Sequence, residues 1–185
     1  MDNNPSRKPI PHIINKTEEI LSPWLRLVTR TVDFENGDDP QIYHSFSQND
    51  YVSILALTPN NEVILVRQYR PTCEGFTIEI PGGLLEKNED PLSCVKRELY
   101  EETGYKAENI YSFEPVIADT GRLSNNVHGF FTHEALIDRD KWISEEGLNC
   151  FTVPLDDFRL MLLDGRIENS IHVAIAGQAM FAGLI

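Results

Sequence analysis

Residues 82–105, GGLLEKNEDPLSCVKRELYEETGY, hold the clearest structural signal in this chain. Within them, Asp90 is of a residue type that caps helix N-termini, and Pro91 suits the first helical position that follows. Gly104 suits the left-handed conformation that commonly ends a helix. The stretch therefore predicts a helix that begins after Asp90 and ends at Gly104.

This predicted helix carries two distinct faces. Its apolar face is formed by residues that recur at helical spacing, namely Leu92, Val95 and Leu99. Glu98, Glu101 and Glu102 recur at i, i+3 and i+4 and share a second face, roughly a quarter turn away. Three like charges destabilise a helix unless something neutralises them, and a divalent cation with oxygen ligands would do so. The alternative is a solvated acidic face on which Arg97 pairs with Glu101 across one turn.

The spacing of the whole stretch distinguishes these two interpretations. It resembles the Nudix box, Gly-x5-Glu-x7-Arg-Glu-U-x-Glu-Glu-x-Gly-U, in which U is a bulky aliphatic residue. Every fixed position of that pattern is matched, by Gly83, Glu89, Arg97, Glu98, Leu99, Glu101, Glu102 and Gly104. The one departure is Tyr105, which stands where an aliphatic residue is usual. A match of this length is specific to the family.

The resemblance implies an α/β fold and a metal site. The expected Nudix fold is a mixed β-sheet in an α/β/α sandwich, here with an N-terminal β-hairpin subdomain. The implied cofactor is Mg²⁺, with Mn²⁺ as a substitute, and its implied ligands are Glu98, Glu101, Glu102 and the backbone carbonyl of Gly82. Arg97 would orient the glutamates, so that Glu98 and Arg97 are candidate catalytic residues, and Glu89 would brace the loop against the helix.

Segments outside the box resemble the branch of the family that hydrolyses ADP-ribose and ADP-sugars. They are residues 66–71 (VRQYRP), 78–83 (IEIPGG) and 119–125 (DTGRLSN). By this resemblance Arg70 would contact the substrate's phosphates or terminal ribose, with Arg67 nearby, and Glu79 would lie beside the metals. The alternative is that both arginines are ordinary surface charges at a strand end.

The general base in this branch usually comes from a loop after the box. The matching stretch is residues 142–147 (WISEEG), so Glu146 and Glu145 are the candidates. The alternative is a solvated loop with no part in the chemistry.

The N-terminal residues 1–48 form a predicted arm and β-hairpin, and residues 49–185 form the predicted Nudix domain. The first ~20 residues are polar and favour a loose or dimer-clasping arm. Residues 24–34 and 42–47 are the predicted hairpin strands. By the resemblance, this hairpin would be exchanged across a homodimer, with Trp24 and Tyr43 stacking on the nucleobase, although packing in the core or interface would suit either residue.

Other elements follow from periodicity and turn residues. Strands are expected at residues 51–57, 62–67, 77–80, near Val116, and at 127–131 and 150–153, and helices at 155–163 and 171–185. The last of these is expected to be a buried terminal helix. Of the five histidines, His44, His128, His133 and His172 lack metal-ligand spacing, so structural roles are expected for these four.

The bulk properties exclude several classes of protein. The chain has 185 residues and a formal charge of −13, which opposes nucleic-acid binding and requires any phosphate site to supply positive charge locally. Three cysteines without CxxC spacing predict reduced thiols and a cytoplasmic protein. No stretch is long and apolar enough to predict a membrane span.

The sequence therefore predicts a Mg²⁺-dependent enzyme that hydrolyses a nucleoside diphosphate sugar to a nucleoside monophosphate and a sugar phosphate. The nucleobase stays open, because stacking discriminates poorly between bases and Pro115 matches the proline of ADP-ribose enzymes poorly. Two alternatives remain. One is a Nudix enzyme for dinucleoside polyphosphates, capped RNA or oxidised nucleotides, and the other is a Nudix-like ligand sensor without catalysis.

Overall fold

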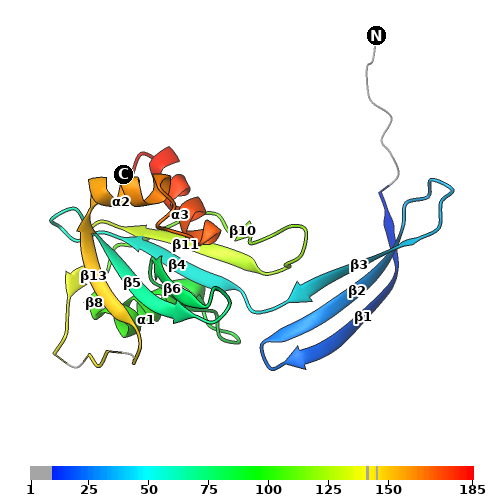
Figure 1. The fold of residues 1–185 in the computed structure, drawn as a ribbon, viewed down its shortest axis with the longest axis horizontal. Helices are drawn as coiled ribbons and strands as arrows, with labels where there is room; N and C mark the ends of the chain where they lie inside the picture. Colours follow the sequence, from blue (N-terminus) through cyan, green and yellow to red (C-terminus); the bar gives the residue numbers. More distant parts are fainter. Residues whose placement is uncertain (1–9, 141, 145) are drawn as a thin grey trace, which may run out of the picture. The chain divides into compact units, whose positions relative to one another are not determined.

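The computed structural model describes residues 10–140, 142–144 and 146–185. Its residue contacts divide the chain into two compact units. The N-terminal unit contains the chain up to Gln48 together with Ile117–Asn125, and the main unit contains Asn49–Val116 and Asn126–Ile185. Both units are drawn in Figure 1.

The N-terminal unit is a three-stranded antiparallel sheet with the order β1-β2-β3. Its strands are β1 (His12–Ser22), β2 (Leu25–Asp33) and β3 (Gln41–Ser47). The segment 117–125 joins it through the backbone N–H of Phe46, which donates to the carbonyl of Arg122 at 2.7 Å. Of the two alternatives predicted for the first ~20 residues, the loose arm is wrong from His12 onward, while the dimer-clasping arm stays a prediction. Although β1 is polar and exposed, its backbone groups pair along the free edge of β2, and local polarity does not oppose that pairing.

A five-stranded sheet supports the predicted box. Its strands are β4 (Tyr51–Ala56), β7 (Gly82–Leu84), β9 (Tyr111–Ser112), β10 (Val116–Ile117) and β11 (Asn126–Thr132). Their order is β10-β11-β4-β7, with β9 paired to β11. Because β11 runs parallel to β4 whereas β7 runs antiparallel to it, the prediction of a mixed sheet is confirmed.

A second, antiparallel sheet has the order β13-β5-β6. Its strands are β5 (Glu62–Arg70), β6 (Gly75–Glu79) and β13 (Asn149–Pro154). A short ladder pairs β8 (Tyr105–Lys106) with β12 (Leu136–Ile137). Strand β5 extends beyond the predicted residue 67, so that Arg70 lies on a strand opposite Gly75.

Three helices cover the sheets of the main unit. They are α1 (Pro91–Thr103), α2 (Leu155–Leu163) and α3 (Ser170–Phe181). In Figure 1, α1 lies on one side of the strands, and α2 and α3 lie on the other. This arrangement confirms the predicted α/β/α sandwich. No helix in the described part of the chain has the length and apolar character needed to cross a membrane.

Helix α1 has the predicted ends. The side chain of Asp90 accepts a hydrogen bond from the backbone N–H of Ser93, and Pro91 occupies the first turn. Gly104 takes the left-handed conformation at φ 71° and its N–H donates to the carbonyl of Tyr100. The apolar face differs in one respect, because Leu92 is 40% exposed while Cys94 is buried beside Val95 and Leu99 in the core.

Helix α3 buries only one side, so the prediction of a buried terminal helix is wrong in part. The residues that it buries are His172, Ile175, Ala176 and Ala179. Phe181 at its end is 97% exposed. The physical reason is that α3 packs on β4 and β11 along a single stripe, and nothing in the described chain covers its other face.

Candidate active site

The turn before α1 brings the backbone of Gly82 and Gly83 against neighbouring groups. A Cβ atom at position 82 would collide with the carbonyl oxygen of Val52, and one at position 83 would collide with the carboxyl group of Glu98. Only glycine fits at these two positions without a shift. The absence of side chains lets the carboxylate of Glu98 lie directly on the backbone of the turn.

Arg97 connects the carboxylates of the box. Its Nε and Nη2 donate to the two oxygens of Glu89 at 3.0 and 3.1 Å. Its Nη1 donates to Glu98 at 2.8 Å and to Glu101 at 2.9 Å. Hydrogen bonds from this guanidinium lower the pKa of Glu89 to about 2. Glu89 also accepts the backbone N–H of Glu86 at 3.1 Å, which ties the loop to the helix.

The three glutamates on the acidic face have different surroundings. Glu101 is exposed, the side chain of Glu98 is 15% exposed and Glu102 is buried. An oxygen of Glu102 accepts the backbone N–H of Gly82 at 3.0 Å. Burial raises the pKa of Glu98, and the neighbouring carboxylates of Glu101 and Glu89 add to this although Arg97 opposes it. The face therefore carries more negative charge than its one arginine offsets.

This donor set suits a hard divalent cation by its chemistry, since it consists of carboxylate oxygens in a region short of positive charge. The described residues do not form a ready cluster of three metal-binding side chains. The hydrogen bonds above explain why. Arg97 holds Glu98 and Glu101, while Glu102 is directed to the N–H of Gly82. A cation would take the place of these bonds.

A second charged group lies on the β5–β6 hairpin. The register pairs Val66 with Glu79 and Arg70 with Gly75, which places Arg70, Thr77 and Glu79 on one face of the sheet. Arg70 donates from Nε and Nη2 to the two oxygens of Glu79 at 2.8 and 2.7 Å, and Thr77 donates to Glu79 at 2.5 Å. Although burial acts to raise the pKa of Glu79, these bonds hold it below its ordinary value.

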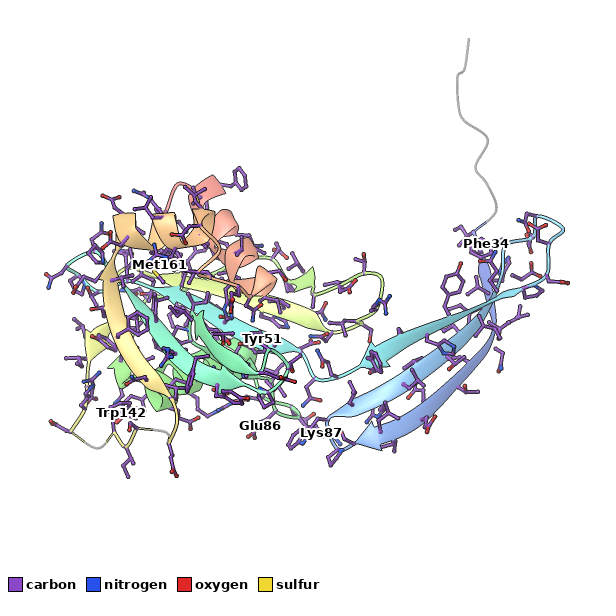
Figure 2. The ribbon with its side chains drawn as sticks, in the orientation of Figure 1. Phe34, Tyr51, Glu86, Lys87, Trp142 and Met161 are labelled. Carbon is purple, nitrogen blue, oxygen red and sulfur yellow. The ribbon has the colours of Figure 1, made fainter. Side chains whose placement is uncertain are left out.

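Tyr51 connects this group to the box, and sequence analysis did not identify it. Burial raises the pKa of its phenol, and the nearby carboxylates of Glu102 and Glu79 add to the rise. It is half-buried at the start of β4 and is labelled in Figure 2. Only the pairing of β4 with β7, which places Tyr51 opposite Leu84, brings it to the box, so no local pattern could have identified it.

The other substrate candidates are exposed. Arg67 lies over the ring of Phe76, with its guanidinium carbon 4.0 Å from the ring centre. In the N-terminal unit, Trp24 is 66% exposed between β1 and β2, and Tyr43 is 46% exposed on β3. The hydroxyl of Tyr43 donates to Gln41 at 2.9 Å. These side chains are therefore accessible for contact with a ligand.

The loop of the candidate base is anchored to α1 by Trp142. Its indole N–H donates to the backbone carbonyl of Glu101 at 2.9 Å, and the guanidinium of Arg139 lies 4.9 Å from its ring centre. Trp142 is labelled in Figure 2. Glu146 lies in an exposed turn and makes no hydrogen bond or ion pair with the described glutamates of the box. Glu145 lies outside the described residues.

Three comparisons with known proteins agree with one another. The family model of the NUDIX domain matches residues 48–170. The chain is 29% identical to a GDP-mannose pyrophosphatase of Yersinia enterocolitica, over 94% of this chain and 97% of that protein. It is 34% identical to an ADP-ribose pyrophosphatase of Bacillus subtilis, over 69% of each. A crystal structure of an ADP compounds hydrolase has the same fold, with a TM-score of 0.77 at 18% identity over 94% of this chain and 95% of that one.

Proposed function

The chain belongs to the Nudix hydrolase family, and from that premise we propose that it hydrolyses the pyrophosphate bond of a nucleoside diphosphate sugar. Water would attack one phosphorus and the bridging P–O bond would break, which releases a nucleoside monophosphate and a sugar phosphate. The observation that carries the proposal is the acidic face of α1, held by Arg97 against the turn at Gly82 and Gly83. The two relatives support it, since both are named for a nucleoside diphosphate joined to a sugar.

Mg²⁺, with Mn²⁺ as a substitute, is the proposed cofactor. Glu98, Glu101, Glu102 and the carbonyl of Gly82 would hold it, because they offer oxygen ligands on one face of α1 and the turn beside it. Bound there, the metal would neutralise the pyrophosphate and lower the pKa of an attacking water. The net charge of −13 is then no obstacle to an anionic substrate.

The protein groups would bind, orient and accept a proton. Arg97 would keep Glu98 and Glu101 in place through its bonds to them, and the carboxyl group of Glu98 lies against the turn at Gly83. Glu146, or Glu145, would accept the proton from the attacking water. Arg70 keeps Nη1 free of hydrogen bonds to described residues, so this nitrogen would donate to a substrate oxygen. Arg67 and Glu79 would complete this side of the site.

The N-terminal residues 1–48 are proposed to recognise the base and to form a homodimer, with residues 49–185 as the hydrolase domain. Large apolar side chains on this unit support the proposal because they are open to solvent. They include Ile13, Ile20, Trp24, Ile42 and Tyr43. An exposed apolar surface of this kind commonly marks an interaction site. Cytoplasmic localisation stays a prediction.

Product analysis on a substrate panel tests the function. ADP-ribose, ADP-glucose, GDP-mannose, UDP-glucose and dinucleoside polyphosphates would be incubated with the enzyme, with and without Mg²⁺. We expect Mg²⁺-dependent release of monophosphate and sugar phosphate from the sugar nucleotides. Tight binding of one compound without turnover of any would instead favour the ligand sensor, and preferred cleavage of dinucleoside polyphosphates would favour another Nudix activity.

A further inference from the structure

A cavity of about 280 Å³ opens in the main unit between the start of β4, the β5–β6 hairpin and the residues that precede α3. The polar side chains that line it are those of Tyr51, Arg70, Thr72, Thr77, Glu79, Glu168 and Asn169, and the thiol of Cys73 lies among them. Tyr51 and Arg70 also interact electrostatically with Glu102 of the box. Glu79 in the lining ends β6, and the chain then runs into β7 at Gly82, so one wall of the cavity leads into the turn at Gly82 and Gly83.

The lining of the cavity offers hydrogen bonds but little net positive charge. Arg70 is paired with Glu79, so its charge is offset, and Glu168 adds a negative charge. The oxygen of Asn169 accepts the backbone N–H of Ile171 at 3.0 Å as the cap of α3. Its amide nitrogen has no partner among the described residues, so two N–H donors are left.

His172 does not line the cavity itself but lies beside Tyr51, which does, and its buried ring calls for an explanation. It is fully buried on α3, and neither ring nitrogen has a hydrogen-bond partner among the described residues. Its ring lies nearly parallel to that of Tyr51, with 6.5 Å between the two ring centres, and it interacts electrostatically with Glu79 and Arg70. Unpaired polar groups in the interior are costly, and they are found where a site serves another purpose than stability.

We propose that this cavity binds the sugar ring of the substrate, and that Glu168 and Asn169 determine which sugar is accepted. The inference rests on the proposed function and extends it to the group beyond the cleaved bond. Carboxylate and amide groups suit sugar hydroxyls, which both donate and accept hydrogen bonds. A further phosphate group would meet Glu79 and Glu168 in the lining, where Arg70 is already paired with Glu79, so the cavity should favour an uncharged ring over a phosphorylated one.

Paired substrates separate this inference from the proposed function. GDP-mannose and ADP-ribose would be compared with GDP and ADP that carry a methyl ester on the β-phosphate, because the esters keep the pyrophosphate but lack the ring. Diadenosine tetraphosphate would supply a charged group beyond the cleaved bond. We expect the wild-type enzyme to favour the better sugar nucleotide over its methyl ester by about tenfold in kcat/KM, as for the loss of one or two hydrogen bonds.

Two variants remove the proposed contacts. Asn169→Ser keeps an oxygen for the helix cap but removes the amide donors. Glu168→Ala removes an exposed carboxylate that makes no hydrogen bond or ion pair with described residues, so folding should be unaffected. Each should raise KM for the sugar nucleotide by about tenfold and leave kcat/KM for the methyl ester within about twofold. Glu108→Ala, at a side chain that is 91% exposed outside this cavity, is the matched control.

The outcomes are distinct. Equal losses on the sugar nucleotide and its methyl ester, or no loss on either, would overturn the sugar site. The sugar site would also be overturned if wild-type enzyme cleaves the methyl esters with the same kcat/KM as the sugar nucleotides, or if it prefers diadenosine tetraphosphate. If the methyl esters are cleaved equally well, the proposed hydrolysis of the pyrophosphate bond would still hold. Cleavage of no compound with a pyrophosphate bond would refute the proposed function itself.

Discussion

The two units of the chain differ in the burial of their large apolar side chains. In the main unit, Val52, Ile64 and Leu99 are fully buried in one core, and charged groups are paired around it. In the N-terminal unit, whose described residues form strands but no helix, Ile20 is 73% and Trp24 66% exposed. Rigid packing holds catalytic groups in place, whereas an open apolar surface serves contact with other molecules. Changes in the main unit should therefore affect turnover and stability, and changes in the N-terminal unit should affect binding.

The largest expected effect is on turnover, from Glu102→Gln in the main unit. Glutamine keeps an oxygen for the N–H of Gly82 but loses the charge proposed to bind the metal. We expect kcat to fall by about a thousandfold, equivalent to ~4 kcal/mol in the barrier, with an unchanged melting temperature. Steady-state kinetics at saturating Mg²⁺ measure it. Near-wild-type kcat would contradict the assignment of Glu102, and Glu108→Gln is the control.

His172 should make the stability of the main unit depend on pH. Burial lowers its pKa from 6.5 to about 4, although Glu79 opposes this and Arg70 adds to it. As the pH falls, the unfolded chain therefore binds the proton before the folded chain does. The contribution of neutral His172 to the free energy of unfolding is complete above pH 6.5, and about 3 kcal/mol of it is lost as the pH falls towards 4 and below. His172→Leu should remove that part of the loss in urea unfolding. Parallel curves for the wild type and variant would contradict it, and His133→Gln, at an exposed site, is the control.

Glu79 and Glu101 provide a smaller contrast within the main unit. Glu79 is 2% exposed and bonded twice to Arg70, whereas the side chain of Glu101 is 56% exposed. Glu79→Gln should lower the free energy of unfolding by about 2 kcal/mol, because it leaves a partly buried guanidinium without its counter-charge. Glu101→Gln should cost less than about 1 kcal/mol. Equal losses of unfolding free energy in urea would show that burial does not make the Glu79 ion pair more stabilising than that of Glu101.

The smallest effect is expected in the N-terminal unit, from Trp24→Ala. Stacking on a base contributes ~1–3 kcal/mol, so KM for the preferred nucleotide sugar should rise by about tenfold while kcat stays within about twofold. Trp24→Phe keeps an aromatic face and should retain most of the affinity. An unchanged KM in Trp24→Ala would remove the stacking role. A large fall in kcat would instead weaken the contrast between the two units.

The box was predictable because its information is local. Helix caps act over one turn, so Asp90, Pro91 and Gly104 could be assigned from their spacing and are found in those roles. Arg97 also pairs with Glu101 at i, i+4, a contact that sequence analysis had assigned only to the alternative of a solvated acidic face. In the N-terminal unit the same approach failed for β1, since a polar strand is stabilised by its neighbour and not by its own composition.

The sequence by itself determined the family, the mixed α/β fold and the face of α1 on which three glutamates gather. Only the tertiary structure decided what meets that face. The register of β5 on β6 paired Arg70 with Glu79, and the pairing of β4 with β7 brought Tyr51 towards Glu102. The start of α3 closed the cavity with Glu168 and Asn169. Tyr51, Glu102 and Glu168 are far apart along the chain, and even Arg70 and Glu79 meet only through the register of one hairpin, so their proximity follows from strand register and helix packing, which no local pattern encodes.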